Sequence, residues 1–489
     1  MQSIVAQGTC LMIYDLGSTF TKVTAFTLKD GDLVFTGRSQ APTTVDNIVI
    51  GMQNAHYNLL NALDVKSMQS DETYATSSAA GGLRMVAMGY MPRVTAKAAK
   101  EVAMSAGARV LEIVSYEDEP GFKIEVLQEI KPDIILLAGG TDGGDQDSMV
   151  HNAGVILESK IDTAVIVAGN VDAQARIGQI LESGNVKVVR VPNVMPTIHQ
   201  LNVRPARQAI HEQFIRQITR AGGLRKISET VSNGKVLPTP GAVLMGAELL
   251  ALGVDGLDGV GDLLLVDVGG ATTDVHSVLF SLQDIPDEEK GLIVSNEKQA
   301  LYRTVEGNLG VRISAGGILD TAGPALILRQ VDLAGSDLEQ QLCNYAAYLE
   351  KNPDHISTID TEQLFDEGLT ITALQIALKR HVGYLSREYD PVAGIAPGTP
   401  VGRDLRKVSR VVGVGGVFTH SDYGKAVRIL TRALANPGWS LLPKQPELII
   451  DNDYLMYAIG VLSQMYPAAS LRFAKRYLKL EDGGTGNEC

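Results

Sequence analysis

Short apolar runs, each followed by a turn that carries glycine or polar residues, mark the first part of the chain. Residues 11–14 (LMIY) have the pattern of a buried strand, and the block 15–22 (DLGSTFTK) follows directly. An extended alternation resumes at Val23 and reaches a second turn at residues 29–32 (KDGD). Strands joined by tight turns predict an antiparallel meander. A helical periodicity replaces it over residues 48–63.

From about residue 94 the pattern changes to an alternation of strands and helices. Four short runs that are β-branched or rich in leucine lie at residues 110–114, 134–138, 164–168 and 186–191. Amphipathic stretches of helical length separate them. Strands of this kind, alternating with helices, predict a parallel sheet with helices on both faces. We therefore expect an inserted, doubly wound α/β subdomain over residues 94–232.

The strand–turn–strand pattern then returns in the second half of the chain. A helix is expected to start at Thr239, which would serve as its N-cap. The apolar run 263–268 enters the turn 269–274 (GGATTD), after which an extended pattern resumes. This block and the first one look like a duplicated element, with Asp15 and Asp267 252 residues apart.

The remaining patterns complete the expected domain organisation. A third buried strand, residues 408–412, enters the glycine turn 413–418 (GVGGVF). Further helices are expected at residues 337–351, 361–385, 425–434 and 451–465. The chain is thus expected to divide into a first lobe (1–93), the α/β insert (94–232), a connecting helix (233–262), a second lobe (263–480) and a flexible polar tail (481–489).

Composition narrows the functional classes. The 489 residues exceed one ordinary core, so about two to four structural units are expected. With 56 acidic against 43 basic residues the formal charge is −13, and no basic block occurs, which argues against a sequence-independent nucleic-acid binder. Cys10, Cys343 and Cys489 are scattered singly, which excludes a disulfide framework or a CxxC metal site and suits a reducing cytoplasm.

The sequence also lacks membrane and export signals. No apolar stretch approaches the roughly 18 residues of a membrane span. The first charged residue is Asp15, so the N-terminus has no cationic leader of the signal-peptide kind. These features predict a soluble cytoplasmic protein.

Three glycine turns, residues 15–22, 267–274 and 413–418, each leave a buried strand and could receive a phosphate group. Glycine lets backbone amides come close to an anion and adopt positive φ, so that consecutive N–H groups form a phosphate nest. Hydroxyls in the first two turns add donors: Ser18, Thr19, Thr21, Thr272 and Thr273. Asp15 and Asp267 stand at the same offset in their turns and could hold a hydrated Mg²⁺ and orient a water.

Other nucleotide-binding patterns are missing. The chain contains no GxxxxGK[ST] and no GxGxxG that opens a helix after a strand, which excludes a P-loop and a Rossmann fingerprint. The third turn has no acid, as a loop that receives an adenosine would not need one. Lys22 ends the first turn and could reach a phosphate; the alternative is a solvated strand lysine.

The three turns carry a resemblance. DLGSTFTK (15–22), DVGGATTD (267–274) and VGVGGVF (412–418) resemble, in this order, the first phosphate, second phosphate and adenosine motifs of the actin-like ATPase superfamily. Residues 240–252 and 454–465 look like its two connecting helices. The resemblance implies a two-lobed actin-like ATPase (ribonuclease H-like) α/β fold that carries the inserted subdomain.

A narrower resemblance covers nearly the whole chain. GGTDGGD (139–145), VAGN (167–170), TVEGNLGVR (304–312) and GRDLRKV (402–408) are similar to the MutL (GlmL) proteins associated with glutamate mutase. That family is encoded beside adenosylcobalamin-dependent carbon-skeleton mutases and is thought to act as their chaperone or reactivating factor. The resemblance implies an Mg·ATP-binding reactivase that works by nucleotide-driven lobe closure, with mutase subunits as partners and homo-oligomer formation left open.

Site roles follow from the same resemblance. Asp15 and Asp267 would be catalytic acids on the metal side, with Asp15 contacting Mg²⁺ through water and Asp267 polarising the attacking water. Nucleotide contacts are implied for Gly17, Ser18, Thr19 and Lys22 in the first turn, Gly269, Gly270, Thr272 and Thr273 in the second, and Gly413, Gly415 and Gly416 at the adenosine end. Further acidic and lysine side chains near the γ-phosphate, present in chaperone ATPases of the superfamily, have no equivalent by spacing. This leaves open whether the protein is a slow ATPase or hydrolyses no ATP.

Several alternatives remain open at this point. A small-molecule kinase would need a general base beside the γ-phosphate, and a non-hydrolysing scaffold would dock the mutase through the insert. In the turn 139–145, Asp142 and Asp145 could form a cation or partner site, or an Asp could cap the next helix. His276 and His420 follow the second and third turns and either line the cleft or are structural.

Overall fold

The chain forms two compact units. The computed structural model describes residues 8–44, 48–78, 84–89, 109–197, 236–279, 301–389 and 396–480, with short stretches between 202 and 232. One unit comprises residues 1–79 and 222–489, and the other comprises residues 80–221. The predicted tail 481–489 lies outside the described residues.

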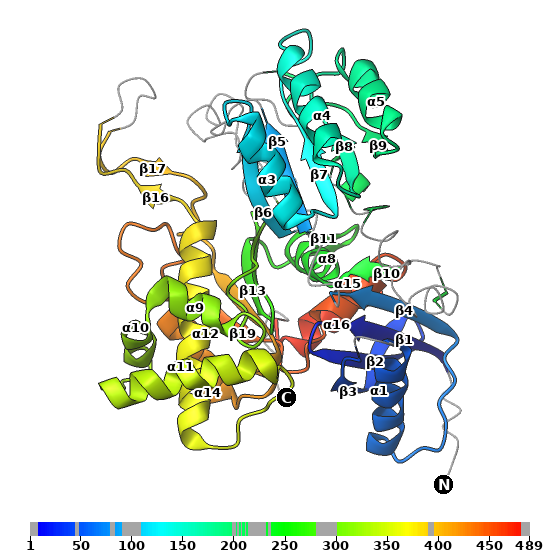
Figure 1. The fold of residues 1–489 in the computed structure, drawn as a ribbon. Coiled ribbons are helices and arrows are strands. Elements are labelled where there is room, and N and C mark those ends of the chain that lie inside the picture. The colour runs from blue at the N-terminus through cyan, green and yellow to red at the C-terminus, as the bar shows by residue number, and fades with distance from the viewer. Residues whose placement is uncertain are drawn as a thin grey trace. The chain divides into compact units, whose positions relative to one another are not determined.

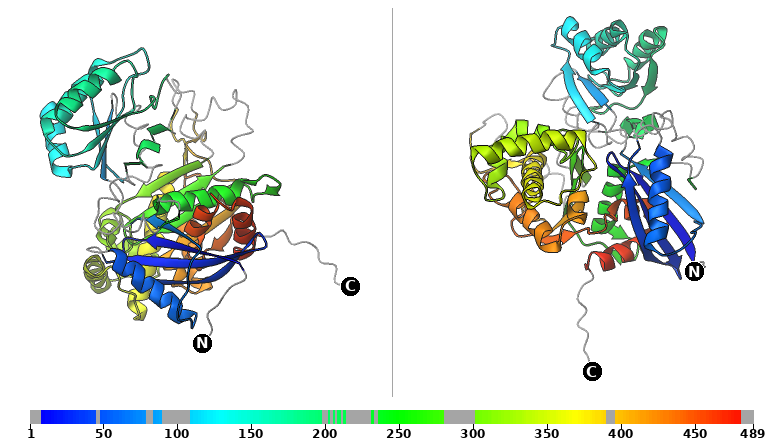
Figure 2. Two further views of the ribbon diagram at one scale, coloured as in Figure 1. Left: turned by 90° about the vertical axis from the view of Figure 1, so that its right-hand side faces the viewer. Right: turned by 60° about the horizontal axis from the view of Figure 1, so that its bottom comes forward.

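The first lobe of the larger unit is built on a five-stranded sheet. Its strands, in the order β10-β4-β1-β2-β3, are β1 (Thr9–Leu16), β2 (Phe20–Lys29), β3 (Asp32–Pro42), β4 (Glu72–Ser77) and β10 (Val236–Pro238). β1, β2 and β3 form the predicted antiparallel meander, whereas β4 and β10 join it in parallel. Helix α1 (Ile48–Ala62) lies along this sheet in Figure 1 and Figure 2, where it contacts β2 and β3.

The second lobe repeats this arrangement. Its sheet has the order β15-β14-β13-β18-β19, from β13 (Leu263–Val268), β14 (Thr273–Val278), β15 (Leu301–Glu306), β18 (Arg410–Gly415) and β19 (Glu447–Ile450). β13, β14 and β15 are antiparallel, and β18 and β19 are parallel to β13. Asp15 pairs with Lys22 across the first hairpin, and Asp267 pairs with Asp274 at the same place in the second. The predicted duplication and two-lobed fold are therefore confirmed.

Two crossing helices lie between the sheets. α8 (Thr239–Leu252) contacts β4 and β10 of the first lobe and β13 and β14 of the second, and α15 (Met456–Leu462) contacts β1. Together with α16 (Pro467–Tyr477), they share one apolar core with both sheets. α8 and α15 meet at Gly246 and Gly460, where their backbones come so close that neither position has room for a Cβ. These helices therefore join the lobes through backbone contact.

The other face of the second sheet is covered by a layer of helices. They are α9 (Ala315–Ala322), α10 (Pro324–Arg329), α11 (Ser336–Lys351), α12 (Asp360–His381), α13 (Gly416–Thr419) and α14 (Tyr423–Leu434). α12 is the centre of this layer: it contacts α9, α10 and α14 as well as β13, β14 and β15. Two small ribbons complete the lobe: β11 (Gly253–Val254) with β12 (Leu257–Asp258), and β16 (Tyr384–Leu385) with β17 (Pro400–Val401).

The smaller unit contains a parallel sheet in the order β6-β5-β7-β8-β9. Its elements are β5 (Arg84–Gly89), β6 (Arg109–Ser115), α3 (Pro120–Ile130), β7 (Ile134–Leu137), α4 (Asp147–Ser159), β8 (Ala164–Val167), α5 (Gln174–Ser183) and β9 (Lys187–Arg190). The strand order reverses direction between β5 and β7, as in a doubly wound sheet. α3, α4 and α5 share one apolar core with it. β5 lies before residue 94, the boundary that the sequence predicts.

No described helix combines the length and the apolar character that crossing a membrane would require.

Two histidines are buried in the second lobe in contrasting ways. His381, on α12, has both ring nitrogens bonded, to Ser277 Oγ at 2.7 Å and Thr304 Oγ1 at 2.8 Å. His276, on β14, is fully buried, and neither ring nitrogen has a hydrogen-bond partner among the described residues. Burial, and then the positive charge of Arg303, hold the pKa of His276 well below its usual 6.5. His276 does not line the cleft described below.

His276→Leu is expected to stabilise the fold or leave its stability unchanged at pH 7.5, because it removes two unsatisfied buried nitrogens. It should also weaken the loss of stability in acid. Below pH 6.5 the unfolded histidine takes up a proton and the buried one does not. The free energy of unfolding of the wild type therefore falls by about 1.4 kcal/mol per pH unit through this group, and the variant does not have this loss. Urea unfolding at pH 7.5 and 5.5 measures both effects. His381→Leu is the control and should destabilise the fold at both pH values. If His276→Leu lost as much stability between pH 7.5 and 5.5 as the wild type, the prediction would be contradicted.

Candidate functional site

A cleft of about 250 Å³ opens between the two lobes where the three glycine turns meet. Most of the predicted site residues line it: Gly17, Ser18, Thr19 and Lys22 from the first turn, Asp267, Gly269 and Gly270 from the second, and Gly415 and Gly416 from the third. Duplicate sheets that face each other through α8 and α15 bring these three strand ends together. The turns are thus joined by the fold, although they lie far apart in sequence.

The first two turns are built alike. The amide of Gly17 donates to the carbonyl of Phe20 at 3.1 Å, and that of Gly269 donates to the carbonyl of Thr272 at 2.9 Å. The turns touch each other, since a Cβ added to Gly270 would lie 2.6 Å from Thr19 Cγ2. The amides of Ser18, Thr19 and Gly270 donate to no other described residue. They are available to an anion, which is the property that a phosphate nest requires.

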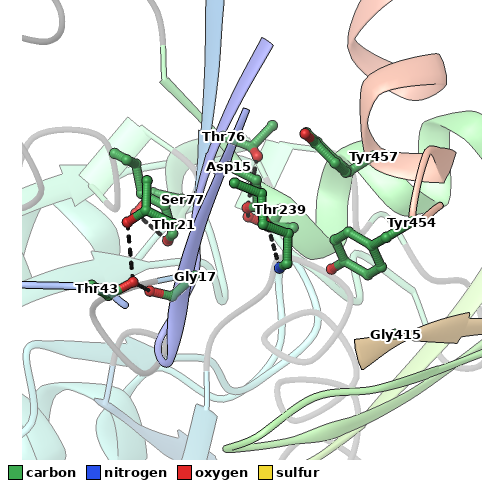
Figure 3. A network of polar contacts seen from close by, with 12 residues as sticks. Asp15, Gly17, Thr21, Thr43, Thr76, Ser77, Thr239, Gly415, Tyr454 and Tyr457 are labelled. Carbon is green, nitrogen blue, oxygen red and sulfur yellow. Dashed lines mark hydrogen bonds and ion pairs between the residues drawn. The ribbon is translucent and has the colours of Figure 1, made fainter. Parts of the chain in front are cut away.

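Asp15 lies under the first turn, where it is fully buried. Its Oδ2 accepts from Lys22 Nζ at 2.9 Å, and its Oδ1 accepts from Thr76 Oγ1 at 3.0 Å and Thr239 Oγ1 at 2.6 Å (Figure 3). Asp15 is therefore absent from the cleft lining, and Lys22 stands between it and the cleft. The expectation that Thr239 is the N-cap of its helix is wrong: Thr239 is the first residue of α8, and its hydroxyl is bonded to Asp15.

Asp267 meets a different neighbour at the equivalent place. The residue opposite it is Asp274, an acid, where Asp15 has Lys22. Burial, and then the charge of Asp274, raise the pKa of Asp267 to about 7, against the opposing effect of Lys22. Asp274 itself is held by Arg303 at 2.9 Å. The two predicted acids therefore differ. The charge of Asp15 is balanced by Lys22 of its own hairpin, whereas Asp267 faces the cleft without a basic partner in its own hairpin.

Tyr454 also lines the cleft, and sequence reasoning missed it as a site residue. Its ring lies 4.2 Å, centroid to nitrogen, from Lys22 Nζ, and its hydroxyl donates to Asp267 Oδ2 at 3.4 Å. Tyr454 has a φ of +53°, which is uncommon for an aromatic residue. This bend delays the helix predicted from residue 451, since α15 begins only at Met456.

Three predicted contacts lie off the cleft. The hydroxyl of Thr272 donates to Asp274 Oδ2 at 3.3 Å, and that of Thr273 donates to the carbonyl of Leu309 at 2.7 Å. Gly413 lies inside β18, where an added Cβ would be 3.1 Å from Phe418 and Leu430. None of the three lines the cleft. Their assignment to a nucleotide stays a prediction.

Another part of the cleft lining comes from α12 and the segments around it. Arg312 forms a two-fold ion pair with Asp366, with both N–O distances at 2.9 Å, and Arg428 forms one with Glu367 at 2.7 Å. These carboxylates line the cleft with their charge already balanced. The arginine pairs were missed, because each joins residues more than fifty positions apart and no local pattern marks them.

His420 closes one side of the cleft. Its Nε2 lies 3.3 Å from Gln40 Nε2, which belongs to the first lobe. Burial, and then the charges of Arg38, Arg312 and Lys22, lower the pKa of His420. Of the two alternatives left open for His420, the structure favours the one in which it lines the cleft. The positive side chains near His420 thus come from both lobes, and acids line the same cleft.

In the turn 139–145 of the smaller unit, both acids accept hydrogen bonds from neighbouring segments. Asp142 Oδ1 accepts from Asn193 at 2.8 Å and from the amide of Val171 at 3.1 Å, and Asp145 accepts from the amide of Ser148 at 3.3 Å near the start of α4. Nowhere in the described part of the chain do three or more His, Cys, Asp or Glu side chains gather as a metal site. These bonds favour the tight-turn interpretation.

Comparison with known proteins agrees with the family that the sequence resembles. The family described as MutL protein matches residues 11–478. Protein MutL of Clostridium tetanomorphum is 37% identical over 472 residues, which span 96% of this chain and 98% of that protein. Among solved structures, diol dehydratase-reactivating factor in nucleotide-free form is 10% identical, with a TM-score of 0.34 over 94% of this chain and 100% of that chain. A ROK hexokinase from Thermus thermophilus is 12% identical, with a TM-score of 0.26 over 96% and 99% of the two chains.

Structural likenesses as remote as these two carry no argument about ligand or partner. The family assignment stands instead on the sequence, because the matched region runs from β1 to the end of α16 and the curated relative aligns almost end to end. The chain therefore belongs to the MutL protein family.

Proposed function

We propose that this chain binds Mg·ATP in the interlobe cleft and acts as a chaperone or reactivating factor for an adenosylcobalamin-dependent carbon-skeleton mutase of the glutamate mutase type. The observation that carries the proposal is the meeting of two equivalent hairpin turns, with free amides, Lys22 and Asp267, in one cleft. The partner follows from the family resemblance. Nucleotide binding would change the relative populations of lobe arrangements, and with them the affinity for the mutase.

The donor set fits a hydrated Mg²⁺ rather than a metal held by protein alone. Mg²⁺ keeps several waters and binds through one or two carboxylates together with substrate phosphates. Asp267 offers one carboxylate at the cleft, and Asp15 lies behind Lys22, from where it would act through water. When bound, the ion would neutralise charge on the phosphates. Lys22 would hold phosphate oxygens, and the amides of the two turns would orient them.

Calorimetric titration of the full chain with Mg·ATP tests nucleotide binding. The same titration of Lys22→Met tests whether Lys22 contacts the phosphates. The variant is expected to bind at least about tenfold more weakly, because it loses a charge-assisted contact to phosphate. Lys351→Met, at the exposed end of α11, is the matched control and should bind like wild type. Equal binding by Lys22→Met and wild type would contradict the assignment of Lys22.

Recovery of an inactivated mutase tests the partner. The mutase, holding damaged cofactor, should regain turnover only when this chain and Mg·ATP are both added. Transfer of phosphate from ATP to a sugar or hydroxy acid at a high rate would favour the kinase alternative. Full recovery with Asp267→Ala would favour a scaffold that does not need the acid.

A further inference from the structure

The side chain of Lys22 is held from two directions. Asp15, from the same hairpin, lies at 2.9 Å on one side, and the face of Tyr454, from the segment that precedes α15, lies at 4.2 Å on the other. Only 18% of the lysine side chain is exposed. A lysine has a flexible four-carbon stem and much rotamer freedom, so two anchors restrict its ammonium far more than one would.

Tyr454 is itself fixed in an unusual conformation. Its left-handed φ of +53° costs an aromatic residue about 1–3 kcal/mol, and such strain persists where the surroundings enforce it. The surroundings here are the bend that follows Asp451 and the ring of Tyr457, whose centroid lies 5.4 Å away. Tyr457 is in turn held by Thr24 of the first lobe at 2.8 Å. Figure 3 shows both tyrosines beside the Asp15 network.

We propose that Tyr454 is a positioning residue of the phosphate site: its ring holds the ammonium of Lys22 in the cleft, while its hydroxyl contacts Asp267. One side chain of the second lobe would thus fix the charged group that the first lobe presents to the phosphates. This inference rests on the proposed nucleotide binding. A purely packing role is different. If Tyr454 only filled space, its loss should weaken the binding of the adenosine part and of the phosphates equally.

Binding of ATP, ADP and adenosine to two variants of Tyr454 separates the positioning role from the packing role. Tyr454→Leu removes the ring and should weaken binding of ATP and ADP by roughly threefold to thirtyfold, with adenosine unaffected. Tyr454→Phe keeps the ring and should bind all three within about twofold of wild type, since the 3.4 Å hydroxyl contact is long. In Lys22→Met the ring has no ammonium to hold. Adding Tyr454→Leu to Lys22→Met should therefore cost no further ATP affinity.

A readout without nucleotide keeps the test independent of the proposed function. With lysines labelled by ¹³C-methylation, and the Lys22 signal assigned through Lys22→Arg, that signal should be shifted by the tyrosine ring in wild type and Tyr454→Phe but not in Tyr454→Leu. If wild type shows this shift yet binds no ATP, the proposed function fails and the contact stands. An unshifted Lys22 signal, an equal loss of adenosine and ATP affinity in Tyr454→Leu, or additive losses in the double variant would each overturn the inference.

Discussion

Asp15→Ala is expected to abolish measurable Mg·ATP binding and to destabilise the larger unit. The buried carboxylate accepts three hydrogen bonds, from Lys22, Thr76 and Thr239, and these donors belong to β2, β4 and α8. Removing the acid leaves two buried hydroxyls and one ammonium without their acceptor. Breaking a buried pair in this way costs about 3 kcal/mol or more. A loss of about a hundredfold or more in nucleotide affinity is expected from the missing metal-side charge.

Asp15→Asn separates these two effects. Its amide oxygen can still accept from Thr76 and Thr239, so most of the stability should remain, but the charge is gone. We expect Asp15→Asn to melt closer to wild type than Asp15→Ala does and to bind Mg·ATP almost as poorly. Thermal melts and calorimetry on the same preparations measure both. Asp332→Asn, at an exposed ion pair, is the control and should change neither. Wild-type affinity in Asp15→Asn would remove Asp15 from the metal side.

The parts of the fold that the sequence predicts are those marked locally. Buried strands such as 11–14 and 263–268 are apolar runs that end in glycine turns. This pattern can be recognised without knowing which strands they pair with. The duplication is visible because both turns keep an Asp at the same offset. The same comparison could have shown the asymmetry of the site: the seventh residue after Asp15 is Lys22, and the seventh after Asp267 is Asp274.

What the sequence did not reveal depends on contacts between distant segments. Tyr454 reaches the cleft because the chain bends before α15, and no periodicity announces a residue of positive φ that is not glycine. Thr239 has the pattern of a helix cap, yet its hydroxyl goes to an aspartate more than two hundred positions away. β5 was not recognised, because its short run at residues 84–89 precedes the alternation that marks the other strands of its sheet. These are properties of the folded packing rather than of local sequence.

Gly460→Ala is expected to be among the most damaging single-methyl changes in the chain. A Cβ at this position of α15 would overlap the carbonyl oxygen of Ala242 and lie 2.8 Å from the amide nitrogen of Gly246, both on α8. Backbone atoms inside two packed helices cannot move aside as a flexible side chain could. Forcing the helices apart should cost about 3 kcal/mol or more, at the upper end of overpacking effects.

Gly241→Ala, on α8 itself, is the matched control. Its Cβ would meet only Pro238, at 3.8 Å, which is an ordinary contact, so helix propensity alone should leave stability unchanged or raise it by up to about 1 kcal/mol. Urea unfolding of both variants compares the same added methyl group inside the α8–α15 crossing, at Gly460, and outside it, at Gly241. Because α8 and α15 join the lobes, Gly460→Ala should also lose affinity for Mg·ATP, while Gly241→Ala keeps it. Equal stability of the two variants would mean that the helices do not cross in backbone contact.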